Sequence, residues 1–328
     1  FLPPDKRRRI WVRANNIRMN MPPFMPPAGL SNPHVQTILS SIGRKLRPQK
    51  SDLHTTTRRQ IFTVNGVQLA VDLNITAGQP LIILIPGWLG DSQSTYIISA
   101  ATALDEKNFS TARINLRDHG KTTHLNAGLF NSAQHDEVIA LVDQLSVEYG
   151  GAGSGLIGFS LGGNFALRVA RARPELKTLA ICPAISPAST MQKIDRSPIY
   201  QHYFVRKWRS VWTDKQSAFP QRYNFAEALK LTTVSALTDY FVRYHSDFDS
   251  TSAYFAAYDL SQSALAGVTA HILAAADDPI IPVSHYQDLP DSLAVTLTQQ
   301  GGHGAYLDSW RLTSWADSYA TNFFSTLS

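Results

Sequence analysis

The 328-residue sequence has a single cysteine and lacks any long hydrophobic run. One thiol excludes an internal disulfide and a metal site built from several cysteines. The longest unbroken apolar runs, such as residues 81–85, are far shorter than the ~18 residues that a membrane-spanning helix needs. Cys182 ends the apolar stretch 179–182, and we interpret it as a small buried side chain rather than a reactive thiol.

Charge is sparse and unevenly distributed. Charged residues make up 17% of the chain and hydrophobic residues 44%, which suits a globular protein with a large core. Residues 1–60 hold twelve Lys/Arg and two Asp/Glu, although the net charge of the whole chain is only +5. A basic segment could contact anionic lipid or an acidic partner, but we interpret it as a solvated segment that wraps the domain. It has no nucleic-acid-binding motif, so no nucleic-acid partner is expected.

The basic run Lys6–Arg9 is not followed by the apolar segment of a secretory signal. We therefore expect a cytoplasmic protein, with peripheral membrane contact through the basic arm as a further option. The sequence leaves open whether a segment precedes Phe1, and it defines no oligomeric state.

Hydrophobic patterning predicts strands that alternate with helices from residue 58 onward. The β-rich runs 58–64 and 67–74 are separated by Asn65-Gly66, which favours a type I′ hairpin turn. Alternation of this kind implies right-handed crossovers and a mostly parallel sheet with helices on both faces. Further strands are expected at 81–85, 111–115, 155–158, 178–182, 270–274 and 294–298, and helices at 93–106, 134–149, 161–171 and 309–325.

We expect the chain to divide into three parts. Residues 1–57, rich in proline and basic residues, form an extended arm with one short helix near 33–40. Residues 58–185 and 263–328 form the α/β core, and the helix-prone, aromatic-rich segment 186–262 is inserted as a helical cap. The aromatic residues of the cap could line an apolar pocket or form the packing core of the cap itself.

The stretch Gly158-Phe159-Ser160-Leu161-Gly162 lies where a strand is expected to turn into a helix. G-x-S-x-G in this context is the pattern of a nucleophile elbow, where glycines make room for a strained serine backbone. Ser160 is therefore the candidate nucleophile. The alternative is a plain glycine-serine turn.

Two later loops carry the partners that a serine nucleophile requires. Asp277 and Asp278 follow one strand, and His303 follows the next. Because each loop follows a strand of a parallel sheet, these side chains should meet Ser160 at one edge. The order Ser160, Asp278, His303 is that of α/β-hydrolase triads. We favour Asp278 as the acid because it directly precedes Pro279, and Asp277 remains the alternative.

The tetrahedral oxyanion of acyl transfer needs backbone N–H donors. The amide of Leu161, directly after the candidate nucleophile, is one candidate. The loop 86–90 follows the first central strand and holds the other. The Trp88 amide is favoured there because the small Gly87 allows close approach. The alternative is an ordinary glycine-rich turn.

The remaining polar residues show weaker patterns. His119 and His124 do not have a metal-ligand spacing, and we interpret both as loop residues. His119 follows a strand, so it could instead line the mouth of the pocket. No metal or organic cofactor is expected. A solvated face of a cap helix is expected to hold His202, Arg206, Lys207 and Arg209.

These motifs together resemble the YheT-type α/β-hydrolases, a group that includes mammalian membrane-associated lipases and yeast medium-chain ester synthases. The resemblance covers roughly residues 24–325 and rests on Asn32-Pro33-His34-Val35-Gln36-Thr37, the elbow 158–164, 277–279 and 301–304. The first of these motifs is the most specific to the family.

The resemblance implies an esterase or acyl-transfer activity on medium-chain or lipid esters, with Ser160, Asp278 and His303 as the triad. Two stretches depart from the family pattern. Pro86 stands where the family usually has histidine, and residues 115–118 replace Asn-Phe-Arg-Gly.

The sequence therefore predicts a serine carboxylesterase that acts on esters with apolar, short- to medium-chain acyl groups, with a small-molecule or lipid ester as its partner. Acyl transfer or thioester hydrolysis by the same residues is one alternative. A non-catalytic ligand-binding protein of the same fold is another.

Overall fold

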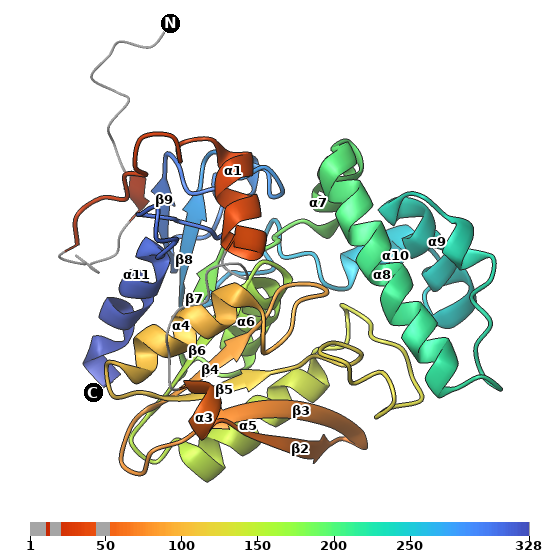
Figure 1. Cartoon of the computed structure of the whole chain (residues 1–328), viewed down its shortest axis with the longest axis horizontal. Coiled ribbons are helices and arrows are strands. Elements are labelled where there is room, and N and C mark those ends of the chain that lie inside the picture. The colour runs from red at the N-terminus through yellow and green to blue at the C-terminus, as the bar shows by residue number, and fades with distance from the viewer. Residues whose placement is uncertain (1–10, 14–20, 44–52, 328) are drawn as a thin grey trace, which may run out of the picture.

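The computed structural model describes residues 11–13, 21–43 and 53–327, and the strands of this part form one nine-stranded sheet (Figure 1). The strand order is β1-β9-β8-β7-β6-β4-β5-β3-β2. Strands β5, β4, β6, β7, β8 and β9 pair in parallel, while β1, β3 and β2 add to the edges in antiparallel fashion. The strands are β1 Trp11–Arg13, β2 Arg58–Val64, β3 Val67–Asn74, β4 Leu81–Ile85, β5 Ser110–Ile114, β6 Ser154–Phe159, β7 Lys177–Ile181, β8 Ala270–Ala275 and β9 Leu293–Thr298.

Helices cover both faces of the sheet. Helices α4 and α11 pack against each other over one face, and α5 and α6 pack over the other (Figure 1). The mostly parallel sheet with helices on both faces, predicted from the sequence, is confirmed. These helices are α4 Thr95–Asp105, α5 Asp136–Tyr149, α6 Leu161–Ala172 and α11 Trp315–Phe324.

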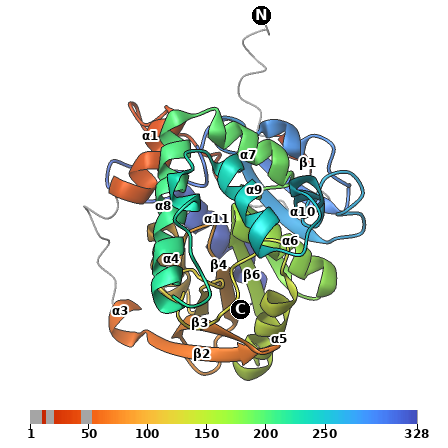
Figure 2. The ribbon, with the colours of Figure 1, turned by 90° about the vertical axis from the view of Figure 1, so that its right-hand side faces the viewer.

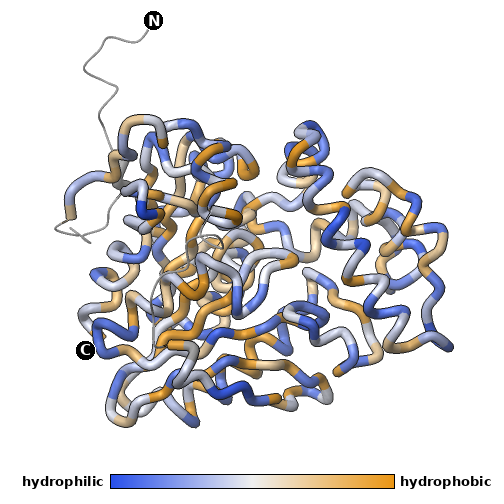
Figure 3. Tube along the Cα trace, in the orientation of Figure 1, coloured by the Kyte–Doolittle hydropathy of each residue, from blue (hydrophilic) through white to orange (hydrophobic). Residues whose placement is uncertain are grey.

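The central strands are apolar because both of their faces are covered. All five residues of β4 are fully buried. Figure 3 shows the same pattern along the chain, with hydrophobic colour concentrated in the strands at the centre. Because such a strand offers only apolar side chains, polar groups at the edge of the sheet must come from the loops that follow the strands.

Between β7 and β8 the chain leaves the sheet and forms a group of helices beside it (Figures 1 and 2). They lie within the segment 186–262 that we expect to be the cap. Helix α7 packs on α8 and α9, and α9 packs on α10. These elements are α7 Pro187–Asp195, α8 Pro198–Ala218, the 3-10 helix Ala228–Lys230, α9 Val234–His245 and α10 Thr251–Ala256.

The described part of the N-terminal arm contains the short helix expected there. Helix α1, Pro33–Ile38, begins where the Asn32 side chain accepts two backbone N–H bonds and proline occupies the first turn. It continues into a π-helical turn, Leu39–Gly43, and the four-residue helix α3, Leu53–Thr56, follows later. Much of the basic arm lies outside the described residues.

Two features of the termini differ from the predicted pattern. Strand β1 pairs antiparallel with β9, and its three residues are too few to show an alternating pattern. The last helix begins at Trp315 rather than near residue 309, because residues 309–312 form a turn in which Leu312 has φ 64°. Among the described residues, no helix combines the length and hydropathy required to cross a membrane.

Candidate active site

Ser160 stands at the sharp turn between β6 and α6 with φ 55° and ψ −117°. A Cβ on Gly158 would lie 2.1 Å from the carbonyl oxygen of Gly162, and a Cβ on Gly162 would lie 2.3 Å from that of Ile85. Only glycine fits at either position. The turn is pinned because the Ser160 N–H donates to the Ile181 carbonyl at 2.9 Å. The half-buried side chain thereby reaches the cavity at the end of the strand, as the elbow pattern predicts.

His303, on the loop after β9, is bonded to Asp278. Its Nδ1 lies 2.8 Å from Oδ2 of Asp278, and Asp278 is only 4% exposed. The other carboxylate oxygen accepts the backbone N–H groups of Ile280 at 2.7 Å and Ile281 at 2.9 Å. A carboxylate only accepts, so Nδ1 carries the proton and Nε2 of His303 is left with its lone pair.

Asp277, the alternative acid, faces another partner. Its Oδ1 accepts the backbone N–H of Gly302 at 2.9 Å, and burial raises the pKa of its carboxyl. Asp277 therefore braces the turn before His303, while Asp278 contacts the imidazole itself.

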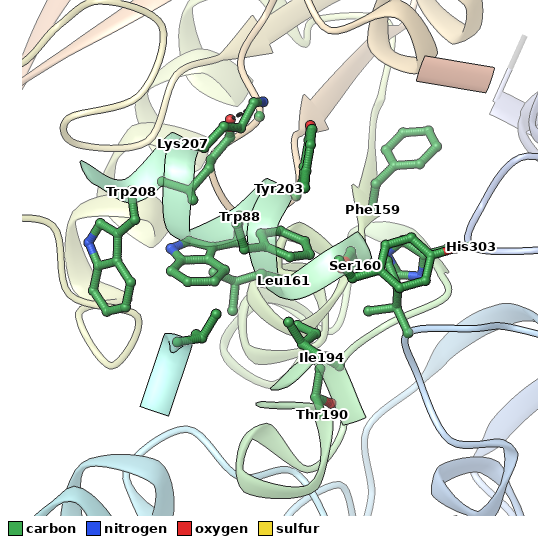
Figure 4. Close-up of a pocket in the computed structure, with 18 of the residues that line it drawn as sticks. Trp88, Phe159, Ser160, Leu161, Thr190, Ile194, Tyr203, Lys207, Trp208 and His303 are labelled. Carbon is green, nitrogen blue, oxygen red and sulfur yellow. Dashed lines mark hydrogen bonds between the residues drawn. The ribbon is translucent and has the colours of Figure 1, made fainter. Parts of the chain in front are cut away.

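Ser160 and His303 both line a cavity of about 540 Å³. Figure 4 draws them together at one end of this cavity. Within the described part of the chain, neither the Ser160 hydroxyl nor His303 Nε2 has a hydrogen-bond partner. Both atoms therefore face the cavity without another described partner.

The loop 86–90 after β4 lies against the elbow. A Cβ added to Gly87 would lie 3.2 Å from both the Phe159 carbonyl oxygen and Ser160 Cβ, so a larger residue there would crowd the elbow. The amides of Trp88 and Leu161 make no hydrogen bond among the described residues. The structure therefore places both candidate donors beside the serine with their N–H groups unused.

His119 supports this loop from behind. Its Nε2 accepts the N–H of Leu89 at 3.0 Å, and its Nδ1 donates to the Arg117 carbonyl at 2.7 Å. Burial lowers the pKa of His119 to about 4, so the ring stays neutral as these bonds require. The interpretation of His119 as an ordinary loop residue is incomplete. The one signal in the sequence is its place after a strand, in Asp118-His119-Gly120.

Lys207 corrects another expectation. It does not lie on a solvated face of α8, because its Nζ donates to the Leu89 carbonyl at 2.9 Å and its side chain lines the cavity. The residue Leu89, with φ 57°, is thus bonded through both its N–H and its carbonyl. Arg209 is also engaged, donating to the Leu231 carbonyl at 2.6 Å.

Two more cap lysines hold other loops of the core. Lys193 on α7 donates to the carbonyl oxygen of Asp278 at 2.6 Å and to that of Ile281 at 3.1 Å. Lys215 on α8 is fully buried and lies 2.7 Å from Oδ1 of Asp118. Burial lowers the pKa of both lysines. The cap is thereby tied to the loops that surround the site.

The aromatic residues of the cap serve both of the purposes that the sequence left open. Some form packing core, such as Phe225, which is fully buried and stacks on Trp212. Others form the cavity wall, where Trp88 stacks on Phe204 and meets Trp208 edge-on (Figure 4). The aromatic cap residues that line the cavity are Tyr200, Tyr203, Phe204, Trp208, Trp212, Phe241, Tyr254, Phe255 and Tyr258.

Donor atoms of Cys182, Asp278 and His303 lie within 4.8 Å of one another. Cys182 is buried, as predicted, and burial raises the pKa of its thiol well above its ordinary value, which disfavours the thiolate that binds metals. The carboxylate and Nδ1 are already bonded to each other. Asp278 and His303 therefore already satisfy each other at this position.

A nucleophile elbow at the end of a mostly parallel sheet defines the class of α/β hydrolases. Comparison with known families agrees. The model of the alpha/beta hydrolase family matches residues 82–313, and the chain belongs to this family.

Among curated proteins, the candidate esterase YheT of Escherichia coli (strain K12) is 23% identical over 319 residues, covering 92% of this chain and 93% of that protein. The predicted resemblance to the YheT group is confirmed by this match. A candidate esterase/lipase of Haemophilus influenzae is 31% identical over 112 residues, covering 34% of this chain and 36% of that protein.

Solved structures share the fold. An esterase of Pyrococcus furiosus aligns with a TM-score of 0.55 at 14% identity, covering 84% of this chain and 92% of its own. A serine hydrolase of Cycloclasticus zankles aligns with a TM-score of 0.53 at 16% identity, covering 83% of this chain and 97% of its own.

Proposed function

We propose that this protein is a serine esterase that cleaves carboxylic esters with apolar acyl groups through an acyl-enzyme on Ser160. The observation that carries the proposal is the 2.8 Å contact between Asp278 and His303 at a cavity that also contains the strained Ser160. A serine hydroxyl becomes a useful nucleophile when an oriented base takes its proton. The similarity to proteins named as esterases supports this chemistry.

In the first step, His303 Nε2 takes the proton from Ser160 as the serine oxygen attacks the ester carbonyl carbon. The carbonyl oxygen becomes negatively charged and is stabilised by the amides of Trp88 and Leu161. Asp278 keeps Nδ1 protonated and stabilises the imidazolium that forms.

The imidazolium of His303 then gives its proton to the alcohol oxygen as the carbon–oxygen bond breaks, and the acyl group stays on Ser160. A water molecule next attacks the acyl carbon while His303 again takes a proton. Collapse of this second intermediate returns the proton to Ser160 and releases the carboxylic acid, so the enzyme is restored.

The cavity wall supports an apolar acyl group. Its aromatic and aliphatic side chains offer a surface on which each buried methylene contributes roughly 0.8 kcal/mol. A charged group of a substrate placed against this aromatic wall would lose its hydration. We therefore expect kcat/KM to rise with acyl length until the cavity is filled.

The test is covalent labelling combined with turnover. A fluorophosphonate probe should label the wild-type protein, and p-nitrophenyl esters from acetate to octanoate should be cleaved. Ser160→Ala should lose both properties while unfolding at a similar temperature. A wild-type protein that is neither labelled nor active on any of these esters would overturn the proposal.

A further inference from the structure

The N-terminal helix α1 packs directly on the turn that carries His303. A Cβ added to Gly302, the preceding residue, would lie 2.9 Å from Gln36 Cβ, from the Pro33 carbonyl oxygen and from Thr37 Oγ1. Gly302 also has φ 58°, a conformation that favours glycine. The turn therefore has α1 on one side and Asp277, which accepts the Gly302 N–H, on another.

Thr37 bonds the backbone of His303 itself. The His303 N–H donates to Thr37 Oγ1 at 2.9 Å, and the Thr37 hydroxyl donates its own proton to the Pro33 carbonyl at 2.8 Å. The second bond fixes the direction of the hydroxyl, so that a lone pair faces the His303 amide. The threonine thus acts as an oriented acceptor.

Gln36 holds the other end of the same loop. It is 1% exposed, and its side-chain oxygen accepts the N–H of Leu307 at 2.7 Å. Its amide nitrogen donates to the carbonyl oxygen of Leu307 at 3.1 Å and to that of Leu30 at 2.8 Å. A buried amide with this many bonds has one orientation, so residues 303–307 are tied to α1 at both ends.

We propose that Thr37 and Gln36 are positioning residues that set the backbone of His303, so that the N-terminal helix is a working part of the active site. This inference rests on the proposed function. The Asp278 carboxylate holds His303 through its imidazole, whereas α1 holds it through its backbone. Both are needed to place Nε2, because a ring tethered only at Nδ1 can still swing with its main chain.

The inference gives the motif Asn32-Pro33-His34-Val35-Gln36-Thr37 a physical role. Asn32 and Pro33 start the helix, and the glutamine and threonine that end the motif hold the His303 loop. The motif also reaches the cap, because His34 Nδ1 lies 2.9 Å from the hydroxyl of Tyr200 on α8.

The test compares Thr37→Val with Thr37→Ser. Valine keeps the shape of threonine but removes the acceptor for the His303 N–H. We expect kcat to fall about 10- to 100-fold with KM nearly unchanged, since small displacements of a catalytic group cost rates of this order. The rate of fluorophosphonate labelling at Ser160 should fall in proportion. Thr37→Ser keeps the hydroxyl, so its kcat and labelling rate should stay within about threefold of the wild-type values.

A matched control is Thr321→Val on α11, where the hydroxyl bonds the Ser318 carbonyl of its own helix and no other residue that the structure describes. This variant should keep wild-type kcat. If Thr37→Val does not fold, Thr37→Ala answers the same question, because it removes the hydroxyl and introduces no new group.

Two results would overturn the inference: a folded Thr37→Val protein with wild-type kcat and labelling rate, or a Thr37→Ser protein that loses as much activity as the valine variant. Neither can be confused with failure of the proposed function, which would appear as an inert wild-type protein.

Discussion

Lys207 on α8 donates a hydrogen bond to the carbonyl oxygen of Leu89 at 2.9 Å, and thereby joins the cap to the loop that carries the Trp88 amide. We expect Lys207→Met to lower kcat about tenfold, because bonds to charged groups contribute about 1.5–3 kcal/mol and this bond holds the loop of the proposed oxyanion donor, the Trp88 amide. Steady-state kinetics on a short ester should show the loss in kcat rather than KM. The control is Arg206→Met, which replaces an exposed cation one position earlier on the same helix. Equal kcat values for the two variants would show that the bond from Lys207 does not affect the chemical step.

The adjacent carboxylates should differ sharply in their effect on catalysis. In Asp278→Asn the remaining oxygen is held by the N–H groups of Ile280 and Ile281, so the amide NH2 faces His303 Nδ1 and favours the wrong tautomer. We expect kcat to fall about 10³- to 10⁴-fold. Asp277→Asn can still accept from the Gly302 N–H, so kcat should stay within about tenfold of wild type. The comparison is made by single-turnover and steady-state assays on one ester. A larger loss for the Asp277 variant would reassign the acid.

The buried pair of Lys215 and Asp118 should matter for stability. Lys215→Met leaves the carboxylate of Asp118 buried without its cation, which typically costs about 3–5 kcal/mol in the free energy of unfolding. The double variant Lys215→Met/Asp118→Asn should recover part of this loss because no charge is left unpaired. Urea titrations measure each value. The exposed pair Lys230–Glu227 provides the control, since Lys230→Met should cost less than about 1 kcal/mol.

Because His271 is buried, we expect the protein to lose stability in mild acid. It is buried in β8, where Nε2 contacts the hydroxyls of Thr296 and Tyr319, and burial together with Lys177 lowers its pKa to about 4. The unfolded chain binds a proton near pH 6.5, so between about pH 6.5 and 4 it binds more protons than the folded protein. The contribution to stability is therefore complete above pH 6.5 and is lost as the pH falls through this window.

The expected slope for one histidine is up to about 1.4 kcal/mol per pH unit. His271→Gln keeps an amide for the same hydroxyls but does not titrate, so its unfolding free energy should vary less between pH 7 and pH 4.5. His124→Gln, at an exposed position, is the control and should leave the wild-type slope unchanged. An unchanged slope in the His271 variant would show that the ring is not kept neutral by the fold.

The sequence could place the three residues of the proposed triad at one edge of the sheet because each of them follows a strand. Ser160, Asp278 and His303 come after β6, β8 and β9, and in a parallel sheet the carboxyl ends of the strands meet at one edge. The prediction needed only the order of strands and helices. The choice between Asp277 and Asp278 needed the local turn, and the structure brings only Asp278 to the imidazole.

The contacts that hold the loops around the site could not be predicted from the sequence. The bond between Lys207 and Leu89 joins residues 118 positions apart, and no periodic pattern tells which face of α8 meets the core. His119 supports its loop across 30 positions in the same way. Helix α1 was expected, but its contact with Gly302 follows from the tertiary fold, because the two segments lie far apart in the sequence.

The backbone of Ser160, with φ 55° and ψ −117°, is in a region that only glycine occupies without strain. A strained residue of this kind typically costs about 1–3 kcal/mol, which the rest of the fold must offset. Ser160→Gly is thus expected to unfold at a higher temperature than wild type while losing all esterase activity, as calorimetry and an ester assay would show. Stability and turnover are opposed at this position, so selection for thermal stability alone would favour loss of the nucleophilic serine.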